Sequence, residues 1–203
     1  MLAVFRHRLR EQFQCFLQPG RSEFFCLVAV CRRRFADARA GWWPFPSTEQ
    51  RRGFLLVRGR VSDHAANYPL FIATAHLESG SLPENADARQ TQLMECVHHL
   101  TRLSIPAIFA GDFNLRENEL PLRHPHFNQL LTFSDAWVAS GCNPQYQFTW
   151  THEEAGHVRA RFDRIYTRDL QLLSFYTLPV KCSSTGRRVS DHCALVGTYQ
   201  MFS

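Results

Sequence analysis

The sequence predicts a mixed α/β domain, because strand-length apolar runs recur along it around one long amphipathic helix. The helical pattern covers residues 85–103, where Leu93, Val97 and Leu100 form one apolar stripe. Pro106 then closes the helix, since proline cannot continue it. Strands that alternate with a long helix are typical of an α/β domain rather than a helical bundle. A chain of 203 residues has the size of one domain and can bury a sizeable core.

The strand-length runs are separated by turn residues or by charged clusters. The expected strands cover residues 24–31, 53–61, 70–76, 107–110, 148–151, 161–166 and 194–199. The first of these is almost entirely apolar, which is typical of a buried strand. Between the first two strands, the Trp- and Pro-rich stretch 42–46 indicates a link.

Residues 1–22 follow a different pattern from the rest of the chain. Large apolar residues recur there at helical spacing, at Phe5, Leu9, Phe13 and Phe16. This spacing favours a short amphipathic helix that ends at Pro19-Gly20.

The composition indicates a globular protein with a basic surface. Hydrophobic residues make up 45% of the chain and charged residues 20%, which excludes a disordered chain. No apolar run approaches the roughly 18 residues of a membrane-spanning helix, so we expect no membrane partner. The formal net charge is +5, and arginine carries it because Lys181 is the only lysine. Arginine suits phosphate recognition through its planar fork, although such a bias can equally reflect genomic base composition.

The cysteines favour a reducing compartment. There are seven, an odd number, and no two have Cys-x-x-Cys spacing. We interpret them as reduced thiols, several of them buried, and therefore expect a nuclear or cytoplasmic protein.

Four short polar motifs stand where predicted strands end. They are Thr74–Ser79, Gly111–Asn114, Arg161–Ile165 and Ser190–His192. Loops at strand ends commonly carry catalytic groups. Each motif alone has a plain structural interpretation as a turn or a helix cap. Their joint occurrence in this order favours a catalytic interpretation.

Together the four motifs resemble those of the endonuclease/exonuclease/phosphatase superfamily. The resemblance implies a four-layer α/β sandwich, in which helices cover the outer face of each of two sheets and strand ends converge on the active site. It also implies a phosphoesterase that uses Mg²⁺, with Mn²⁺ as an alternative. Such a reaction needs charge neutralised at the phosphorus and a water made nucleophilic.

The same resemblance implies a role for each polar residue. His76 and His192 would grip the non-bridging phosphate oxygens, and Asp163 would orient His192 as the carboxylate of a catalytic triad does. Asp112 and Asn114 would position the attacking water and the phosphate.

Longer matches narrow the resemblance to the tyrosyl-DNA phosphodiesterase 2 family. They are His76–Ser79, Phe109–Arg116, Phe148–Trp150 and Arg161–Tyr166, preceded by Pro44–Thr48. The matched region runs from about Phe24 to Thr198, and it implies Mg-dependent hydrolysis of 5′-tyrosyl-DNA bonds in DNA repair.

In that family the DNA end and the scissile phosphate would be held by Ser79, Arg116, Trp150 and Arg161. An indole face stacks a base for roughly 1–3 kcal/mol, and an arginine fork binds phosphate. Plainer interpretations remain for two of these residues: Trp150 as a core aromatic and Arg116 as part of a surface salt bridge.

The opening strands of the family have no match in this sequence. Relatives begin with a strand that ends in asparagine and a second that ends in Gln-Glu, whose glutamate is the principal magnesium ligand. We therefore expect residues 1–22 to lie outside the family domain and residues 23–203 to form a domain that lacks its first strands. A fragment, an incomplete gene model, a splice form and a degenerate paralogue would all look like this.

The missing glutamate leaves Asp191 as the metal ligand, with Glu11 as a weaker candidate. Magnesium prefers several oxygen ligands, so we expect weak metal binding and no magnesium-dependent hydrolysis above background. The apolar strand 24–31 would also lose a neighbour, which predicts an aggregation-prone edge and marginal folding.

Two other functions remain open at this point. Another phosphoesterase of the superfamily, such as a phosphoinositide phosphatase or an apurinic endonuclease, would share the four motifs. A non-catalytic module that binds DNA ends or a protein would keep the groove without the metal. For the favoured function we expect a monomer whose partners are DNA 5′ ends that carry a tyrosyl adduct.

Overall fold

The computed structural model describes residues 10–20, 25–46, 48–63, 66–102, 104–152, 158–182 and 184–201. Its strands are β1 (Phe13–Leu17), β2 (Leu27–Cys31), β3 (Phe35–Pro44), β4 (Gly53–Asp63), β5 (Ala66–His76), β6 (Ala107–Asp112), β7 (Ser134–Asp135), β8 (Trp150–His152), β9 (Val158–Ala160), β10 (Asp163–Arg168), β11 (Leu170–Lys181) and β12 (Arg188–Met201). The helices are α2 (Pro83–Thr101), α3 (Phe127–Leu130) and α4 (Ala136–Ala139), with short 3₁₀ turns at Glu117–Glu119 and Pro144–Tyr146.

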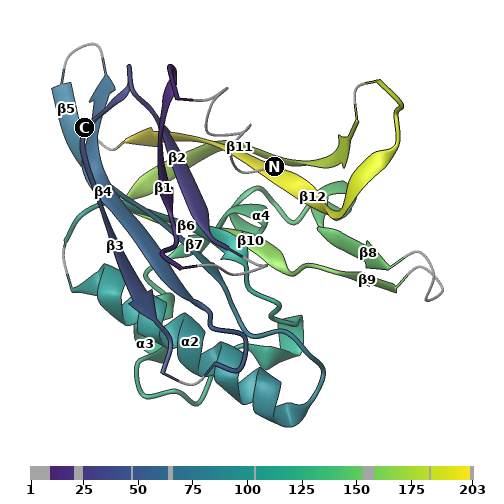
Figure 1. Cartoon of the computed structure of the whole chain (residues 1–203). Helices are drawn as coiled ribbons and strands as arrows, with labels where there is room; N and C mark the ends of the chain where they lie inside the picture. The colour runs from purple at the N-terminus through teal and green to yellow at the C-terminus, as the bar shows by residue number, and fades with distance from the viewer. Residues whose placement is uncertain are drawn as a thin grey trace.

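Three sheets organise these strands (Figure 1). The largest has the order β3-β4-β5-β6-β10-β7, a second has the order β11-β12-β8-β9, and β1 pairs with β2 in a small third sheet. Within the largest sheet β5 and β6 run parallel, whereas β10 runs antiparallel to β6. The C-terminal ends of β5 and β6 therefore meet the N-terminal end of β10 at one edge.

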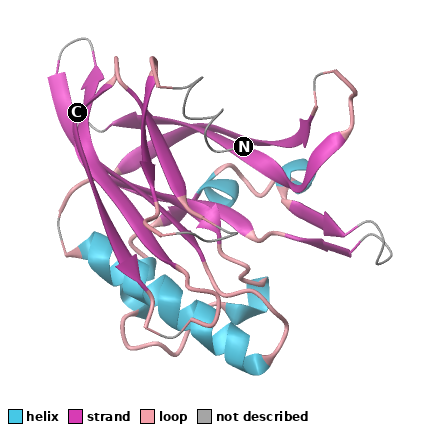
Figure 2. Ribbon diagram, in the orientation of Figure 1, coloured by secondary structure: helices cyan, strands magenta, loops and turns pink. Residues whose placement is uncertain are grey.

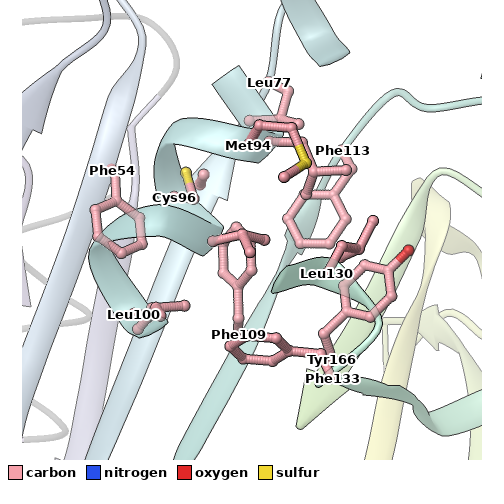
Figure 3. Close-up of a cluster of buried hydrophobic side chains, with 14 of the residues drawn as sticks. Phe54, Leu77, Met94, Cys96, Leu100, Phe109, Phe113, Leu130, Phe133 and Tyr166 are labelled. Carbon is pink, nitrogen blue, oxygen red and sulfur yellow. The ribbon is translucent and has the colours of Figure 1, made fainter. Parts of the chain in front are cut away.

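The main core lies between the largest sheet and α2 (Figure 3). The predicted apolar stripe of the helix, Leu93, Val97 and Leu100, is fully buried. Phe109 of β6 lies at the centre of the aromatic contacts, with its ring centroid 4.7 Å from that of Phe113 and 5.8 Å from that of Phe54. The packed helix fixes β5 and β6, the two strands that carry the first two polar motifs.

The mixed α/β architecture with more than one sheet is confirmed (Figure 2). Ala136 of α4 packs with Ile165 of β10 and Phe175 of β11, so this short helix lies between two sheets. In the described part of the chain, the outer helical layer is therefore the one that α2 forms on the largest sheet. None of the described helices is long and apolar enough to cross a membrane.

The N-terminal helix prediction is wrong for residues 13–17, which form β1. All five of these residues pair with β2, from Phe13 opposite Cys31 to Leu17 opposite Leu27. Phe16 also packs against the apolar cluster around β2. Strand pairing and burial here outweigh the helical spacing, as tertiary context often does. Strand β2 is thus paired with β1 on one side, and among the described residues it has no strand partner on its other side. The expectation of an aggregation-prone edge therefore stays a prediction; Phe5 and Leu9 lie outside the described residues.

Two long strands were missed because their signal is not local. β3 includes most of the presumed link and pairs with β4 up to Pro44 opposite Gly53, and its proline is tolerated because β3 is an edge strand. β11 contains Pro179 and pairs with β12 along almost its whole length. In both cases the partner strand, rather than the segment's own pattern, supplies the stabilisation.

Candidate active site

Three adjacent strands bring three predicted residues into one row. Asp112, at the end of β6, is in register with His76 at the end of parallel β5. It is also in register with Asp163 at the start of antiparallel β10. The backbone N–H of Asp163 donates to the Thr149 hydroxyl at 3.0 Å, which fixes the start of β10. The side chains of one row on one sheet edge can act on a common ligand.

The second long sheet delivers the fourth residue, His192 of β12. Its Nδ1 lies 2.7 Å from Asp163 Oδ2, and its Nε2 lies 4.0 Å from Asp112 Oδ2. The same Asp112 oxygen lies 3.2 Å from His76 Nε2. One carboxylate oxygen therefore faces two imidazoles, and a second carboxylate holds one of them from behind. The structure thus brings together four of the five residues predicted as catalytic through direct side-chain contacts.

The local charges adjust the pKa of Asp112. Burial disfavours its ionised form, but the hydrogen bond and charge of His76, the charge of His192 and the N–H of Asn114 together lower the pKa below its usual value. Asp112 is therefore ionised at neutral pH and acts as an acceptor.

The pKa of His192 moves in the opposite direction. Burial disfavours the imidazolium, but the hydrogen bond and charge of Asp163, with the charges of Asp112 and Asp191, raise the pKa above its usual value. His192 is thereby biased toward its protonated form, which can hydrogen-bond an anion through Nε2 while Asp163 holds Nδ1.

Asn114 reaches the cluster through a strained backbone. Its φ of +49° lies in the left-handed region, which asparagine tolerates better than most residues. The turn lets its N–H donate to Asp112 Oδ1 at 3.0 Å and its Nδ2 donate to the Leu77 carbonyl at 3.1 Å. Asn114 therefore fixes the rotamer of Asp112 and ties the end of β6 to the end of β5.

Ser79 lies next to this row, on the loop that leaves β5. Its hydroxyl donates to Gln50 Oε1 at 2.9 Å and accepts from the Arg52 guanidinium at 3.2 Å. Arg52 is buried, and it also donates to the Leu77 carbonyl at 2.8 Å. A buried cation beside the strand ends was not predicted, because Arg52 directly precedes β4 and belongs to none of the four motifs.

The structural role of Glu78, a residue of the motif Thr74–Ser79, was also not predicted. Its side chain is buried, and Oε2 accepts from Thr48 at 2.7 Å and from Gln92 at 3.2 Å. Thr48 belongs to the matched stretch Pro44–Thr48, which precedes β4. The joint occurrence of this stretch and His76–Ser79 was the sequence signal that could have indicated the contact. Their contact holds the loop after His76 in place.

Trp150 and Asp191 form a pair at the rim. The indole Nε1 donates to Asp191 Oδ2 at 2.8 Å, and the Trp150 ring lies 5.2 Å from the Phe162 ring. Trp150 is half-buried and Asp191 is exposed. His192 pairs with Trp150 across the second sheet, so the rim pair is held next to the histidine.

Arg116 forms a surface salt bridge, which was the plainer interpretation of this residue in the sequence. Its side chain is nevertheless 42% exposed. It donates to Glu119 Oε1 at 2.9 Å. The other partner of Glu119 is Arg89, a fully buried arginine of α2, at 2.8 and 3.2 Å. This carboxylate thus anchors the loop after Asn114 to the helix.

Glu119→Gln should lower the free energy of unfolding at pH 7 by about 3 kcal/mol, because buried Arg89 loses its counter-charge. Burial opposes ionisation of Glu119, but the arginines lower its pKa below 4.5. The ion pair therefore stabilises the fold above about pH 4.5 and is lost as the pH falls through the folded-state pKa. Urea unfolding should show that the free energy of unfolding falls less between pH 6 and roughly pH 3 in the variant than in the parent chain.

Asp169→Asn is the matched control, since the Asp169 side chain is 60% exposed and pairs only at 3.5 Å. An equal pH dependence of the free energy of unfolding in the two variants would contradict the anchoring role of Glu119.

Arg161 is corrected from a DNA-binding residue to a structural one. It is only 7% exposed, and its guanidinium donates to Glu117 at 2.7 and 3.1 Å and to Asp135 at 2.6 and 2.9 Å. It also stacks 4.7 Å from the centre of the Trp137 ring. These two acids come from segments that are distant in the sequence. The motif Arg161–Ile165 alone therefore did not indicate that they occupy the hydrogen-bond donors of the guanidinium.

Asp112, Asp163 and His192 each offer one metal-ligand atom within 4.8 Å of the others. Within the described residues this is the one such cluster; Asp191 and Glu11, the ligands considered from the sequence, are outside it. Two carboxylates suit a hard divalent cation, while each of them already contacts an imidazole, Asp163 that of His192 and Asp112 that of His76. The donors therefore fit a divalent ion held through few direct contacts.

The comparisons with known proteins agree with the fold. The model of the endonuclease/exonuclease/phosphatase family matches residues 9–192. The chain therefore belongs to the endonuclease/exonuclease/phosphatase family. The match begins within residues 1–22, ahead of the domain start expected at residue 23.

Among curated relatives, tyrosyl-DNA phosphodiesterase 2 of Bos taurus is 30% identical over 88% of this chain and 51% of its own length. The Homo sapiens protein of the same name is 31% identical over 75% of this chain and 44% of its own length. The chain thus spans about half the length of these relatives. A solved structure of D. rerio TDP2 complexed with single-strand DNA product aligns over 98% of this chain and 81% of its own, with a TM-score of 0.81 and 22% identity.

Proposed function

We propose that this site hydrolyses the phosphodiester bond between a tyrosine side chain and a DNA 5′-phosphate. The observation that carries the proposal is the Asp163–His192–Asp112–His76 chain of contacts, in which one acceptor carboxylate faces two imidazoles. Such a row offers donors for phosphate oxygens and an acceptor for a water proton within one ligand's reach. The named relatives are tyrosyl-DNA phosphodiesterases, which supports this substrate.

In the proposed reaction the two histidines bind the non-bridging phosphate oxygens. His192 does so through Nε2, because Asp163 holds its Nδ1, and the raised pKa favours its protonated form. The negative charge that grows on those oxygens in the transition state is then met by donors that are already oriented. Asn114 stabilises the arrangement by holding Asp112 in one rotamer.

Asp112 orients the attacking water and takes its proton as the oxygen attacks phosphorus. The new P–O bond forms as the bond to the tyrosine oxygen breaks, and the electron pair leaves with the phenolic oxygen. A phenol has a pKa near 10, so the leaving group departs readily and is protonated by solvent or by an imidazole. The products are a DNA 5′-phosphate and tyrosine.

We further propose that the reaction uses a divalent cation, Mg²⁺ or Mn²⁺. When bound, the ion would neutralise charge on the phosphate, and Asp112 and Asp163 are the carboxylates of the cluster that would hold it. Asp191, the ligand expected from the sequence, lies outside that cluster. Both oxygens of Asp112 and one of Asp163 already accept contacts within the cluster, so we expect weak binding of the ion.

The DNA end is proposed to lie along the rim formed by Ser79, Arg116 and Trp150. Arg116 keeps an exposed guanidinium edge despite its bond to Glu119, and Trp150 is held by Asp191 through its N–H rather than through its ring faces. A base can therefore stack on the indole while the arginine contacts a phosphate. We propose that the protein acts as a monomer in DNA repair, in the nucleus or the cytoplasm.

A second candidate function is binding of DNA ends without hydrolysis. It is favoured by the engagement of Asp191 with Trp150 and of Asp163 with His192, which leaves fewer free carboxylate oxygens for a metal.

A substrate panel separates these functions. The absence of hydrolysis expected from the missing glutamate is replaced here by the opposite expectation, because Asp112, Asp163 and His192 form a cluster that fits a divalent ion. The chain should release tyrosine from a 5′-tyrosyl oligonucleotide with a single-stranded end, in a reaction that rises with Mg²⁺ or Mn²⁺ and stops with EDTA. Preferential hydrolysis of an inositol polyphosphate or of an abasic duplex would assign the site to another branch of the family. Tight, EDTA-insensitive binding of the tyrosyl oligonucleotide without cleavage at any metal concentration would establish the non-catalytic function.

A further inference from the structure

A cavity lies on the face of the largest sheet that α2 covers. It has a volume of about 700 Å³ and lies between β3, β4 and the C-terminal end of α2, the helix that packs along this sheet in Figure 1. Its charged lining comes from Arg39, Arg58 and Arg102. A smaller hollow of about 270 Å³ shares Arg39 and Arg58 and adds Arg60. We call the two together the arginine groove.

The groove contains a charge pair that the fold alone would disfavour. Arg39 of β3 stands directly opposite Arg58 of β4 in the strand register, and like charges at opposed positions destabilise a sheet. No carboxylate in the described part of the chain forms an ion pair with Arg39, Arg58 or Arg102, and Asp37 is the one acid that lines the groove.

Three buried arginines behave differently. Arg89, Arg161 and Arg164 are buried and each pairs with a carboxylate. The groove arginines are exposed, and their uncompensated charge would attract an anionic ligand.

An aromatic surface lies beside these charges. The Trp43 side chain lines the larger cavity and is 38% exposed. Its ring lies over Gly41, where an added Cβ would come within 2.4 Å of the ring. His99 and Phe54 pack against it with ring centroids at 5.3 and 5.8 Å. The indole is therefore held in one orientation while part of it remains open to a ligand.

We propose that the arginine groove binds a segment of single-stranded nucleic acid, with phosphates on Arg39, Arg58 and Arg102 and a base stacked on Trp43. Basic side chains along a groove with an aromatic platform are the features that bind single strands without sequence preference. Arg58 and Arg60 are two residues apart on one strand, roughly 6.8 Å, and extend the charge along the groove.

The groove is separate from the active site. Phe71 lines it, and His76 stands five residues further along β5, roughly 17 Å from Phe71 along the strand. Trp43 is in register, through Phe54, with Ala75, but Phe54 and Ala75 belong to the core under α2. Successive side chains of a strand point to opposite faces, so His76 points away from the face that carries the groove. The groove therefore provides a second binding surface for a nucleic acid strand, and this binding does not depend on the proposed hydrolysis.

Fluorescence anisotropy of a labelled oligothymidylate, measured in EDTA over a range of salt concentrations, tests the proposal. Arg39→Gln/Arg58→Gln should weaken binding by about tenfold and reduce the slope of log K against log salt by about 1.4, because two phosphates would no longer be neutralised by arginine. Trp43→Ala should weaken binding while leaving the salt slope unchanged. The matched control is Arg33→Gln/Arg123→Gln, which removes the same charge from exposed positions outside the groove.

Equal affinity and salt slope for the groove variant and the control variant would overturn the proposal, because net charge alone would then explain binding. Displacement of the oligonucleotide by polyglutamate as readily as by unlabelled oligonucleotide would overturn the choice of nucleic acid as ligand. Since no turnover is required, a loss of hydrolysis in the substrate panel leaves this test unaffected. Thermal unfolding of each variant confirms that folded proteins are compared.

Discussion

Asp112→Asn should reduce the rate of tyrosine release by about 10³-fold, within the range found for loss of a general base. The amide cannot accept the water proton, and it presents no negative charge to the imidazoles 3.2 and 4.0 Å away. Its size and its bond from the Asn114 N–H are retained, so binding of the tyrosyl oligonucleotide should change little. Single-turnover kinetics and equilibrium binding, measured on the same variant, separate the two effects.

Asp169→Asn again serves as the control. This exposed carboxylate directly follows the last residue of β10, at the opposite end of the strand from Asp163. A turnover rate for Asp112→Asn within a few-fold of the parent chain would exclude Asp112 as the proton acceptor.

Phe109→Ala should lower the free energy of unfolding by about 3–5 kcal/mol, the usual cost of deleting a fully buried aromatic ring. Phe109 is fully buried on β6, and its ring contacts those of Phe54 and Phe113. The cavity would open between β6 and α2, directly beneath the strand that carries Asp112. Urea unfolding monitored by circular dichroism measures this loss.

Phe148→Ala is the matched control, because Phe148 is 38% exposed and its deletion should cost about 1 kcal/mol or less. Similar losses for the two alanine variants would contradict the assignment of the core between α2 and the largest sheet.

The polar residues that meet at the strand ends could be located from the sequence, because they stand in short motifs. Periodicity located α2 and β4 to β6, since each has a local apolar pattern. It failed for β1 and β3, whose structure depends on pairing with β2 and β4. No local pattern reports such a partner, and in β1 the apolar spacing happened to match a helix.

Among the site residues, the sequence could not tell an arginine that faces a ligand from one that is saturated within the protein. Arg161 was placed among the DNA-binding residues, yet Glu117 and Asp135, 44 and 26 residues away in the sequence, occupy its guanidinium. Arg52 was overlooked for the related reason that its position beside Ser79 arises from strand pairing.

The most direct test of the proposed hydrolysis is the fate of the water oxygen. Reaction of the 5′-tyrosyl oligonucleotide with divalent metal in water enriched in heavy oxygen should place the label in the DNA 5′-phosphate and leave tyrosine unlabelled, because water attacks phosphorus. Mass spectrometry of both products reads the outcome. Label in the tyrosine, or no metal-dependent labelled phosphate from the parent chain above the level of Asp112→Asn, would contradict hydrolysis at this site.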